Sequence, residues 1–310
     1  MSAPGRMVGV DELRRAWAAV QAGDFHRTQG RHPLASDWGE EGAEASPLSW
    51  CHEPGERVLP VVGCHGGAGG TTVAVAVAEA AAAATESAVG GVRVVECITA
   101  NASGLVGAGD RELGTTGTGW VRSRRGPVLL ERAGQVLTSP GDIPPPRAAG
   151  QPGTLTVLDV GWDLGQVLAT RCWLRPAITH AQVVVLVAAA TMTGLRRMEI
   201  AAALLGDVPH VCLAVVGQPV TRWPWTTAAA AIADSTRSGS AAGAARGEGT
   251  VGGTLRRLGA DGLLVSVPAD RHLALAGLHN APLPAGVQHA ARHLFDLTQP
   301  APGLAKGPNS

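Results

Sequence analysis

The feature that most constrains the fold is one stretch of the chain, from Val58 to Ala84. It begins with the apolar run VLPVV, and short continuous apolar runs are typical of β-strands that are covered on both faces. The glycine-rich segment GCHGGAGG follows, and then TTVAVAVAEAAAAA, in which alanine dominates and nothing breaks a helix before Gly90. A strand, a glycine loop and a helix in this order predict an α/β fold.

The same alternation continues along the chain and predicts a mostly parallel sheet with helices on both faces, a three-layer α/β sandwich. Alternating residues around Arg-Gly-Pro predict a hairpin over 119–133, and ASGLVGAGDRELG, 102–114, is interpreted as a short helix. Further strands are expected at 92–98, 154–160, 183–189, 211–217 and 262–268, and helices at 194–206 and 286–297.

Composition changes along the chain predict how it is divided. Residues 1–56 are expected to hold a short amphipathic helix, at 10–22, and a flexible linker rich in Gly, Pro, His, Glu and Ser. The α/β domain is expected to span 57–298 and to carry a low-complexity Ala/Gly/Ser insertion at 226–252. A polar tail with Pro and Gly, 299–310, is expected to be disordered.

Charge and cysteine content narrow the function classes. The formal net charge is zero, so we expect no direct binding of nucleic acid or of a membrane surface by this chain. The five cysteines show no metal-ligand spacing, and Cys97 and Cys212 lie in apolar runs that predict core positions. The longest apolar run is far shorter than a membrane span, and together these features predict a cytoplasmic protein.

The glycine loop has the geometry of an anion site. A loop between a strand and a helix presents backbone N–H groups at the helix N-terminus, and the helix dipole favours a negative charge there. Within residues 63–71, Gly69 and Thr71 match the end of the phosphate-loop pattern G-x-x-x-x-G-K-[ST], Gly70 stands where that pattern has lysine, and the leading glycine, Gly63, lies one residue earlier than in the pattern. Thr71 or Thr72 could cap the helix or bind Mg²⁺. A plain turn without a ligand stays an alternative, whereas a dinucleotide loop, with Glu96 as the ribose-binding acid, fits the pattern less well.

The segment HGGAGGTT resembles the loop of the MinD/ParA-type P-loop ATPases, which reads K-G-G-x-G-K-[ST], and the resemblance extends over residues 57 to 297. His65 stands at the position of the group's extra lysine, which reaches a partner subunit, and Gly70 at that of its main lysine. The resemblance implies that the phosphates bind to Gly66, Gly67, Ala68, Gly69, Gly70, Thr71 and Thr72.

Further segments match the group in order. Asp159, in LTVLDVGWD, resembles the strand-end aspartate near Mg²⁺, so Thr71 and Asp159 are the implied metal-binding residues. Asp163 follows in place of a Pro-rich turn, and Asp159 with Asp163 is the candidate catalytic pair. Gln218 follows VCLAVVG, where the group has an adenine-reading Asn, and Pro268 and Asp270, in LLVSVPADRHL, match its Pro-x-Asp; these three residues are further implied contacts to the nucleotide.

Three functions are compatible with a loop that lacks lysine. The first is a degenerate MinD/ParA-like protein that binds ATP and Mg²⁺ weakly, hydrolyses slowly or not at all, and acts with protein partners, or as a homodimer, in a partition, conjugation or secretion-type assembly. The second is an active Mg-ATPase in which a partner subunit or an arginine replaces the lysine. The third is a structural adaptor without nucleotide. Lys306 in the tail is the only lysine, and the candidate arginines are Arg122, Arg124 and Arg125.

Overall fold

A computed structural model describes residues 50, 52–84, 90–206, 210–217 and 253–299. All of them belong to one compact unit, which spans residues 45–310. The helix expected at 10–22, the insertion at 226–252 and nearly all of the tail lie outside the described residues. The domain boundary expected at residue 57 stays a prediction, although Glu56, just before it, is buried in the domain.

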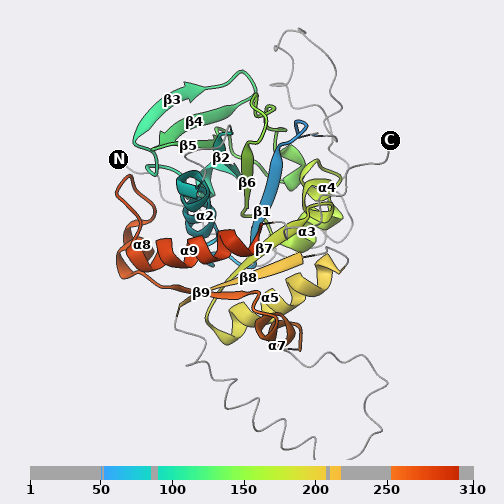
Figure 1. Cartoon of the computed structure of the whole chain (residues 1–310). Helices are drawn as coiled ribbons and strands as arrows, with labels where there is room; N and C mark the ends of the chain where they lie inside the picture. Colours follow the sequence, from blue (N-terminus) through green and yellow to red (C-terminus); the bar gives the residue numbers. More distant parts are fainter. Residues whose placement is uncertain (1–49, 51, 85–89, 207–209, 218–252, 300–310) are drawn as a thin grey trace, which may run out of the picture. The chain divides into compact units, whose positions relative to one another are not determined.

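One sheet organises the described chain (Figure 1), and its outer strands β3 and β4 run antiparallel to their neighbours, while the other pairs are parallel. This confirms the predicted fold class. In sheet order the strands are β3 (Arg111–Thr115), β4 (Trp120–Arg125), β5 (Val128–Ala133), β2 (Val92–Cys97), β6 (Leu155–Val160), β1 (Arg57–Gly63), β7 (Val183–Ala189), β8 (His210–Gly217) and β9 (Leu264–Pro268).

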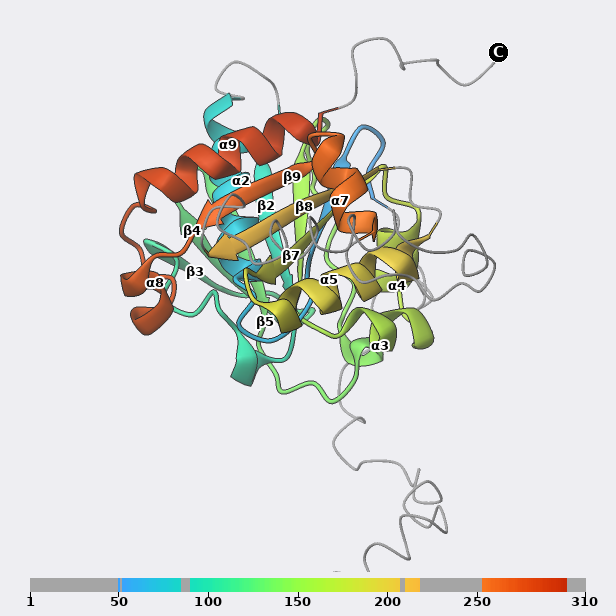
Figure 2. The same ribbon diagram turned by 90° about the horizontal axis from the view of Figure 1, so that it is seen from below.

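Helices cover both faces of the sheet, and each face has its own apolar core (Figures 1 and 2). Successive residues of a strand point to opposite faces, so Val61 packs under one layer of helices and Val62 under the other. The first layer holds α2 (Gly70–Ala84) and α9 (Ala285–Leu297), and the second holds α3 (Leu164–Ala169), α4 (Leu174–Thr179), α5 (Met192–Leu205) and α7 (Gly253–Ala260).

The predicted strands are all present, and the hairpin over 119–133 is confirmed by the antiparallel pairing of β4 with β5. The short helix predicted over 102–114 is wrong. A single 3₁₀ turn, η2 (Ala100–Ala102), precedes an irregular segment that leads into β3. Glycines weaken any helix here, and Gly107 adopts a φ of 80°, which a right-handed helix does not allow.

The short helices α3, α4 and α7, and α8 (Arg271–Ala276) after β9, were not predicted, because six to eight residues are too few to show a clear helical period. The predicted core positions of Cys97 and Cys212 are confirmed, and the four described cysteines are free and buried. None of the described helices has the length and apolar character needed to cross a membrane.

Candidate functional site

The glycine loop lies at the carboxyl end of β1, which is flanked in the sheet by β6 and β7. From β1 the chain passes through α2 to β2 on one side, whereas β6 leads through α3 and α4 to β7 on the other. The strand order therefore reverses at β1. The crevice at the carboxyl end of such a reversal is where open α/β sheets bind their ligands.

The backbone of the loop forms an open cradle of amide groups. Gly67 and Gly69 adopt φ values of 73° and 86°, which residues with a Cβ rarely reach. Within the described residues, no acceptor is recorded for the backbone N–H groups of Gly67, Gly69, Gly70 and Thr71. The first turn of α2 holds no acidic residue, so the helix dipole adds to these donors. This arrangement suits an anion, as predicted for phosphates.

The side chain of His65 links the glycine loop to the end of β7. Its Nε2 accepts a hydrogen bond from the backbone N–H of Ala189, 3.2 Å away, and its Nδ1 lies 2.9 Å from the carbonyl oxygen of Gly66. A ring that accepts at Nε2 carries its proton at Nδ1 and is neutral. At the position where the resembling group has its extra lysine, this chain therefore has an uncharged side chain that holds the loop in place.

The position of the missing main lysine faces a buried carboxyl group. A Cβ at Gly70 would lie 3.7 Å from Oδ1 of Asp159 and in ordinary contact with Gly63. Asp159 is 2% exposed, and its Oδ2 is buried without a hydrogen-bond partner. Burial, with a further contribution from the charge of Glu96, raises the pKa of Asp159 to about 8, against a smaller opposite effect of a hydrogen bond with Thr71. Asp159 is therefore protonated at neutral pH when no cation lies beside it.

Glu96 is the nearest acidic neighbour of Asp159, because β2 pairs with β6 and places the two residues side by side. Its carboxylate accepts from the hydroxyl of Ser103 and, at 2.6 Å, from the backbone N–H of Gly104. Burial raises the pKa of Glu96, and these hydrogen bonds act in the opposite direction. A Cβ on Gly104 would lie 3.0–3.2 Å from the side chain of Thr71, so Glu96 holds this segment directly over the start of α2.

Thr71 and Asp159 fit the role of Mg²⁺ ligands that was predicted for them. A hydroxyl and a carboxylate are the oxygen ligands that Mg²⁺ takes when phosphate oxygens complete its shell. The buried oxygen of Asp159 without a partner is the observation that favours a cation here. Among the described residues, no group of three or more His, Cys, Asp or Glu side chains could hold a metal ion without such phosphates.

Three other predicted site residues lie in the loop, in the first turn of α2 and before α3. Ala68 is buried in the loop, where its N–H donates to the carbonyl of His65 at 3.1 Å, and Thr72 is half-buried in the first turn of α2. Asp163 is exposed and caps α3 by accepting from Gln166 N–H at 3.2 Å, whereas Asp159 is buried in β6, and the catalytic role of the two residues stays a prediction.

Three further residues were predicted to contact the nucleotide. Pro268 ends β9, and Asp270 caps α8 by accepting from Leu273 N–H at 2.9 Å. These positions neither add to nor exclude a nucleotide contact, which stays a prediction. Gln218 lies outside the described residues.

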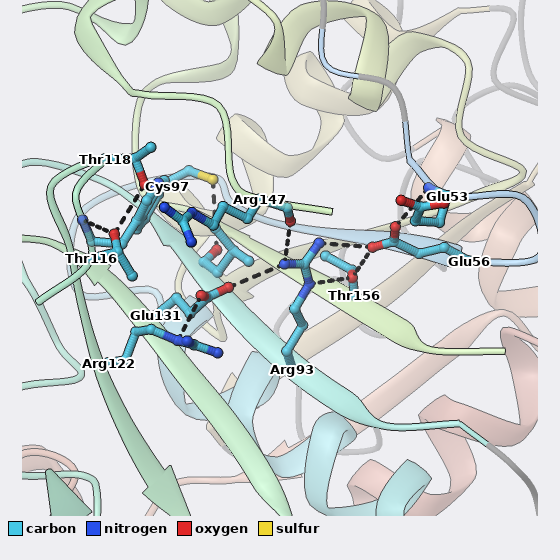
Figure 3. A network of polar contacts seen from close by, with 12 residues as sticks. Glu53, Glu56, Arg93, Cys97, Thr116, Thr118, Arg122, Glu131, Arg147 and Thr156 are labelled. Atoms are coloured by element: carbon cyan, nitrogen blue, oxygen red, sulfur yellow. Dashed lines mark hydrogen bonds and ion pairs between the residues drawn. The ribbon is translucent and has the colours of Figure 1, made fainter. Parts of the chain in front are cut away.

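The arginines suggested as substitutes for lysine are engaged elsewhere. β4, which carries them, is separated from β1 by β5, β2 and β6. Arg122 pairs with Glu131 at 3.2 Å, within the buried network around Arg93 shown in Figure 3. Arg125 is buried, pairs with Glu79 at 2.5 Å and donates to three backbone carbonyls, while Arg124 is exposed.

The sequence reasoning missed Arg132. The hairpin register places Arg132 beside Glu96, and its positive charge lowers the pKa of that residue. Arg132, Glu96 and Asp159 therefore form one row across β5, β2 and β6, on the face that α2 covers. No sequence signal marks this row, because it depends on which strands become neighbours.

No protein-family model matches the sequence, and no curated protein sequence matches it significantly. Solved structures match it in fold. The ParA family ATPase from Chlorobium tepidum TLS is similar with a TM-score of 0.46 and 12% identity, over 77% of this chain and 97% of that chain. MinD from Pyrococcus furiosus gives 0.45 and 16%, over 78% and 97%, and MinD from Pyrococcus horikoshii, complexed with Mg-ADP, gives 0.44 and 14%, over 79% and 96%.

Proposed function

We propose that this chain is a degenerate P-loop protein of the MinD/ParA type, which binds ATP with Mg²⁺ weakly and does not hydrolyse it at a useful rate. It acts through protein partners as an accessory or regulatory component of a partition, conjugation or secretion-type assembly. The observation that carries the proposal is a loop whose amide groups have no acceptor among the described residues, with Gly70 beside the buried carboxyl of Asp159, whose Oδ2 has no hydrogen-bond partner.

The binding step rests on the chain's own groups. The amides of the loop and the N-terminus of α2 hold the phosphates, with the glycines allowing their close approach. The hydroxyl of Thr71 and the carboxylate of Asp159 hold Mg²⁺, which supplies positive charge to the phosphates when bound. Asp159 would ionise to bind Mg²⁺, since its carboxyl group is otherwise protonated.

Among the described residues, the loop itself carries no cation that would stabilise charge in the transition state of hydrolysis. In phosphoryl transfer, catalysis is almost entirely positioning and electrostatic stabilisation of the transferring group. Gly70 offers no cation, His65 is neutral and bound to Ala189, and Arg122 and Arg125 are held in ion pairs. A nucleotide in this cradle is therefore bound as a signal or a structural ligand.

A role through protein contacts is supported by the surface of α5. Met192, Ile200 and Leu204 are 45%, 59% and 49% exposed, and their spacing of eight and four residues places them on one side of the helix. α5 begins just after Ala189 and Thr191, beside the glycine loop. Contact of a partner with this helix is thus well placed to sense the state of the loop.

Phosphate release at saturating Mg-ATP tests the proposal. The wild-type chain and Asp159→Ala are expected to release phosphate at the same background rate, because neither has the lysine that stabilises the transition state. Turnover by the wild-type chain that is lost in Asp159→Ala would overturn the proposal in favour of an active ATPase, with a partner subunit or Arg132 supplying the charge.

A further inference from the structure

Two histidines that have no part in the glycine loop lie side by side after β9. His272 is the second residue of α8, and His279 follows the end of that helix by three residues. Their ring centroids are 5.0 Å apart, and the two ring planes are inclined by 53°. Figures 1 and 2 show α8 at the margin of the domain, and His272 is exposed while His279 is partly exposed. Ions in solution can therefore reach both imidazoles.

The separation of the two rings is the separation that a shared metal ion requires. Zinc–nitrogen bonds are about 2.0–2.1 Å long, so two imidazoles bound to one ion at roughly 90–110° have ring centroids roughly 4.5–5.2 Å apart. The distance between the centroids of His272 and His279 lies within this range. The two rings are thus already at the spacing of a chelating pair.

The hydrogen bonds of the pair leave ring nitrogens available to an ion. Nδ1 of His279 lies 3.3 Å from the carbonyl oxygen of Gly277, and because a carbonyl only accepts, this nitrogen is the donor. In the neutral ring the lone pair is then on Nε2. Metal-bound histidines commonly donate their second ring N–H to a backbone carbonyl in this way. For His272, no hydrogen bond is recorded within the described part of the chain, so its ring nitrogens are not occupied either.

The backbone that carries the two rings is held in place by contacts of its own. Gly277 ends α8 with a φ of 73°, and its N–H donates to the carbonyl of Leu273 at 3.0 Å. The side chain of Leu278 is buried. The carbonyl of His279 accepts at 2.5 Å from Nη1 of Arg125, whose guanidinium is itself buried. Little ordering of the chain is therefore needed for the two rings to bind one ion.

From these contacts we propose that His272 and His279 bind a divalent ion of the first transition row, such as Zn²⁺. Imidazole nitrogen is a preferred ligand of zinc, copper and nickel, whereas Mg²⁺ prefers oxygen ligands. Among the described residues, no third His, Cys, Asp or Glu side chain joins the pair, so water molecules take the remaining positions around the ion. This ion is distinct from the Mg²⁺ of the glycine loop, and the inference does not depend on the function proposed for that loop.

Chemical modification of histidines in the full chain tests the site residue by residue. Diethyl pyrocarbonate reacts with free imidazole nitrogens, and mass spectrometry measures the rate at each histidine. Zn²⁺ at roughly 0.1 mM is expected to slow the reaction at His272 and His279 by about fivefold or more, which corresponds to a Kd of roughly 25 µM or less. Mg²⁺ at the same concentration is expected to have no effect, because it prefers oxygen ligands. His210, an exposed histidine in β8, is expected to react at an unchanged rate with either ion.

Protection of each histidine must depend on the other. In His279→Gln, the protection of His272 by Zn²⁺ is expected to fall below about twofold, because loss of one ligand weakens binding by at least about tenfold. In His272→Gln the same loss is expected at His279, and either variant decides alone if the other does not fold. His210→Gln, the matched change at an exposed histidine outside the pair, is expected to leave the protection of both residues unchanged. The inference is overturned if Zn²⁺ protects neither residue, if Mg²⁺ protects them equally well, or if one histidine stays protected after the other is replaced.

Discussion

Gly70→Lys is expected to tighten the binding of Mg-ATP by roughly 10- to 100-fold, since a charge-assisted hydrogen bond contributes about 1.5–3 kcal/mol. The loop has room for the first atom of the side chain, because the nearest atoms to a Cβ at Gly70 belong to Gly63 and Asp159 and lie 3.5 Å or more away. Gly70 is also the first residue of α2 and does not have a positive φ, so the backbone accepts a lysine. Titration calorimetry of the two proteins with Mg-ATP measures the difference.

Gly70→Gln is the matched control, because it has a side chain of similar reach without the charge. It is expected to bind Mg-ATP as weakly as the wild-type chain does. If Gly70→Lys binds no more tightly than Gly70→Gln, the loop does not direct this position toward a phosphate, and the alternative of a plain turn is favoured.

Asp159→Asn is expected to stabilise the fold, and by an amount that increases as the pH rises from 5 to 8. The pKa of Asp159 in the folded chain is about 8, against an ordinary value of 3.8. The folded state therefore keeps a proton that the unfolded chain releases, so stability falls as the pH rises from the ordinary value through the folded one. Asparagine keeps the shape of the side chain but has no charge to release.

Urea unfolding of both proteins at pH 5 and pH 8 checks this. With 1.36 kcal/mol for each pKa unit, the wild-type chain should lose about 4 kcal/mol relative to Asp159→Asn between these pH values. If the free energy of unfolding falls by the same amount in the two proteins, Asp159 is not buried and unpaired as described. In Gly70→Lys the loss should be smaller, because an ammonium beside the carboxylate lowers its pKa.

The sequence predicted those parts of the fold that follow from local pattern. Short continuous apolar runs identified the strands, and the alanine-rich segment identified α2, since both signals are strong within one element. The segment after β2 was misinterpreted as a helix. Its conformation depends on hydrogen bonds that Ser103 and Gly104 donate to the carboxylate of Glu96 in β2. A contact across seven or eight residues in an irregular segment leaves no period in the sequence.

Some parts of the candidate site could likewise be predicted from local sequence pattern, and others could not. The loop glycines and Asp159 were found because a motif and a strand end mark them. The pairing of Glu96 with Asp159, and the place of Arg132 beside Glu96, follow from the order of β5, β2 and β6 in the sheet. His65 was recognised as lacking the lysine's charge, but its contact with Ala189 links two segments that are 124 residues apart.

Calorimetric titration of Mg-ATP into the wild-type chain and into Gly67→Val tests most directly whether the loop is a working phosphate cradle. Gly67 has a φ of 73° with open space around it, so valine there strains only the backbone that aims the amides. The wild-type chain is expected to bind in the roughly millimolar range, and Gly67→Val to show no binding while remaining folded. No heat from the wild-type chain, or equal heat from the two proteins, would contradict the account.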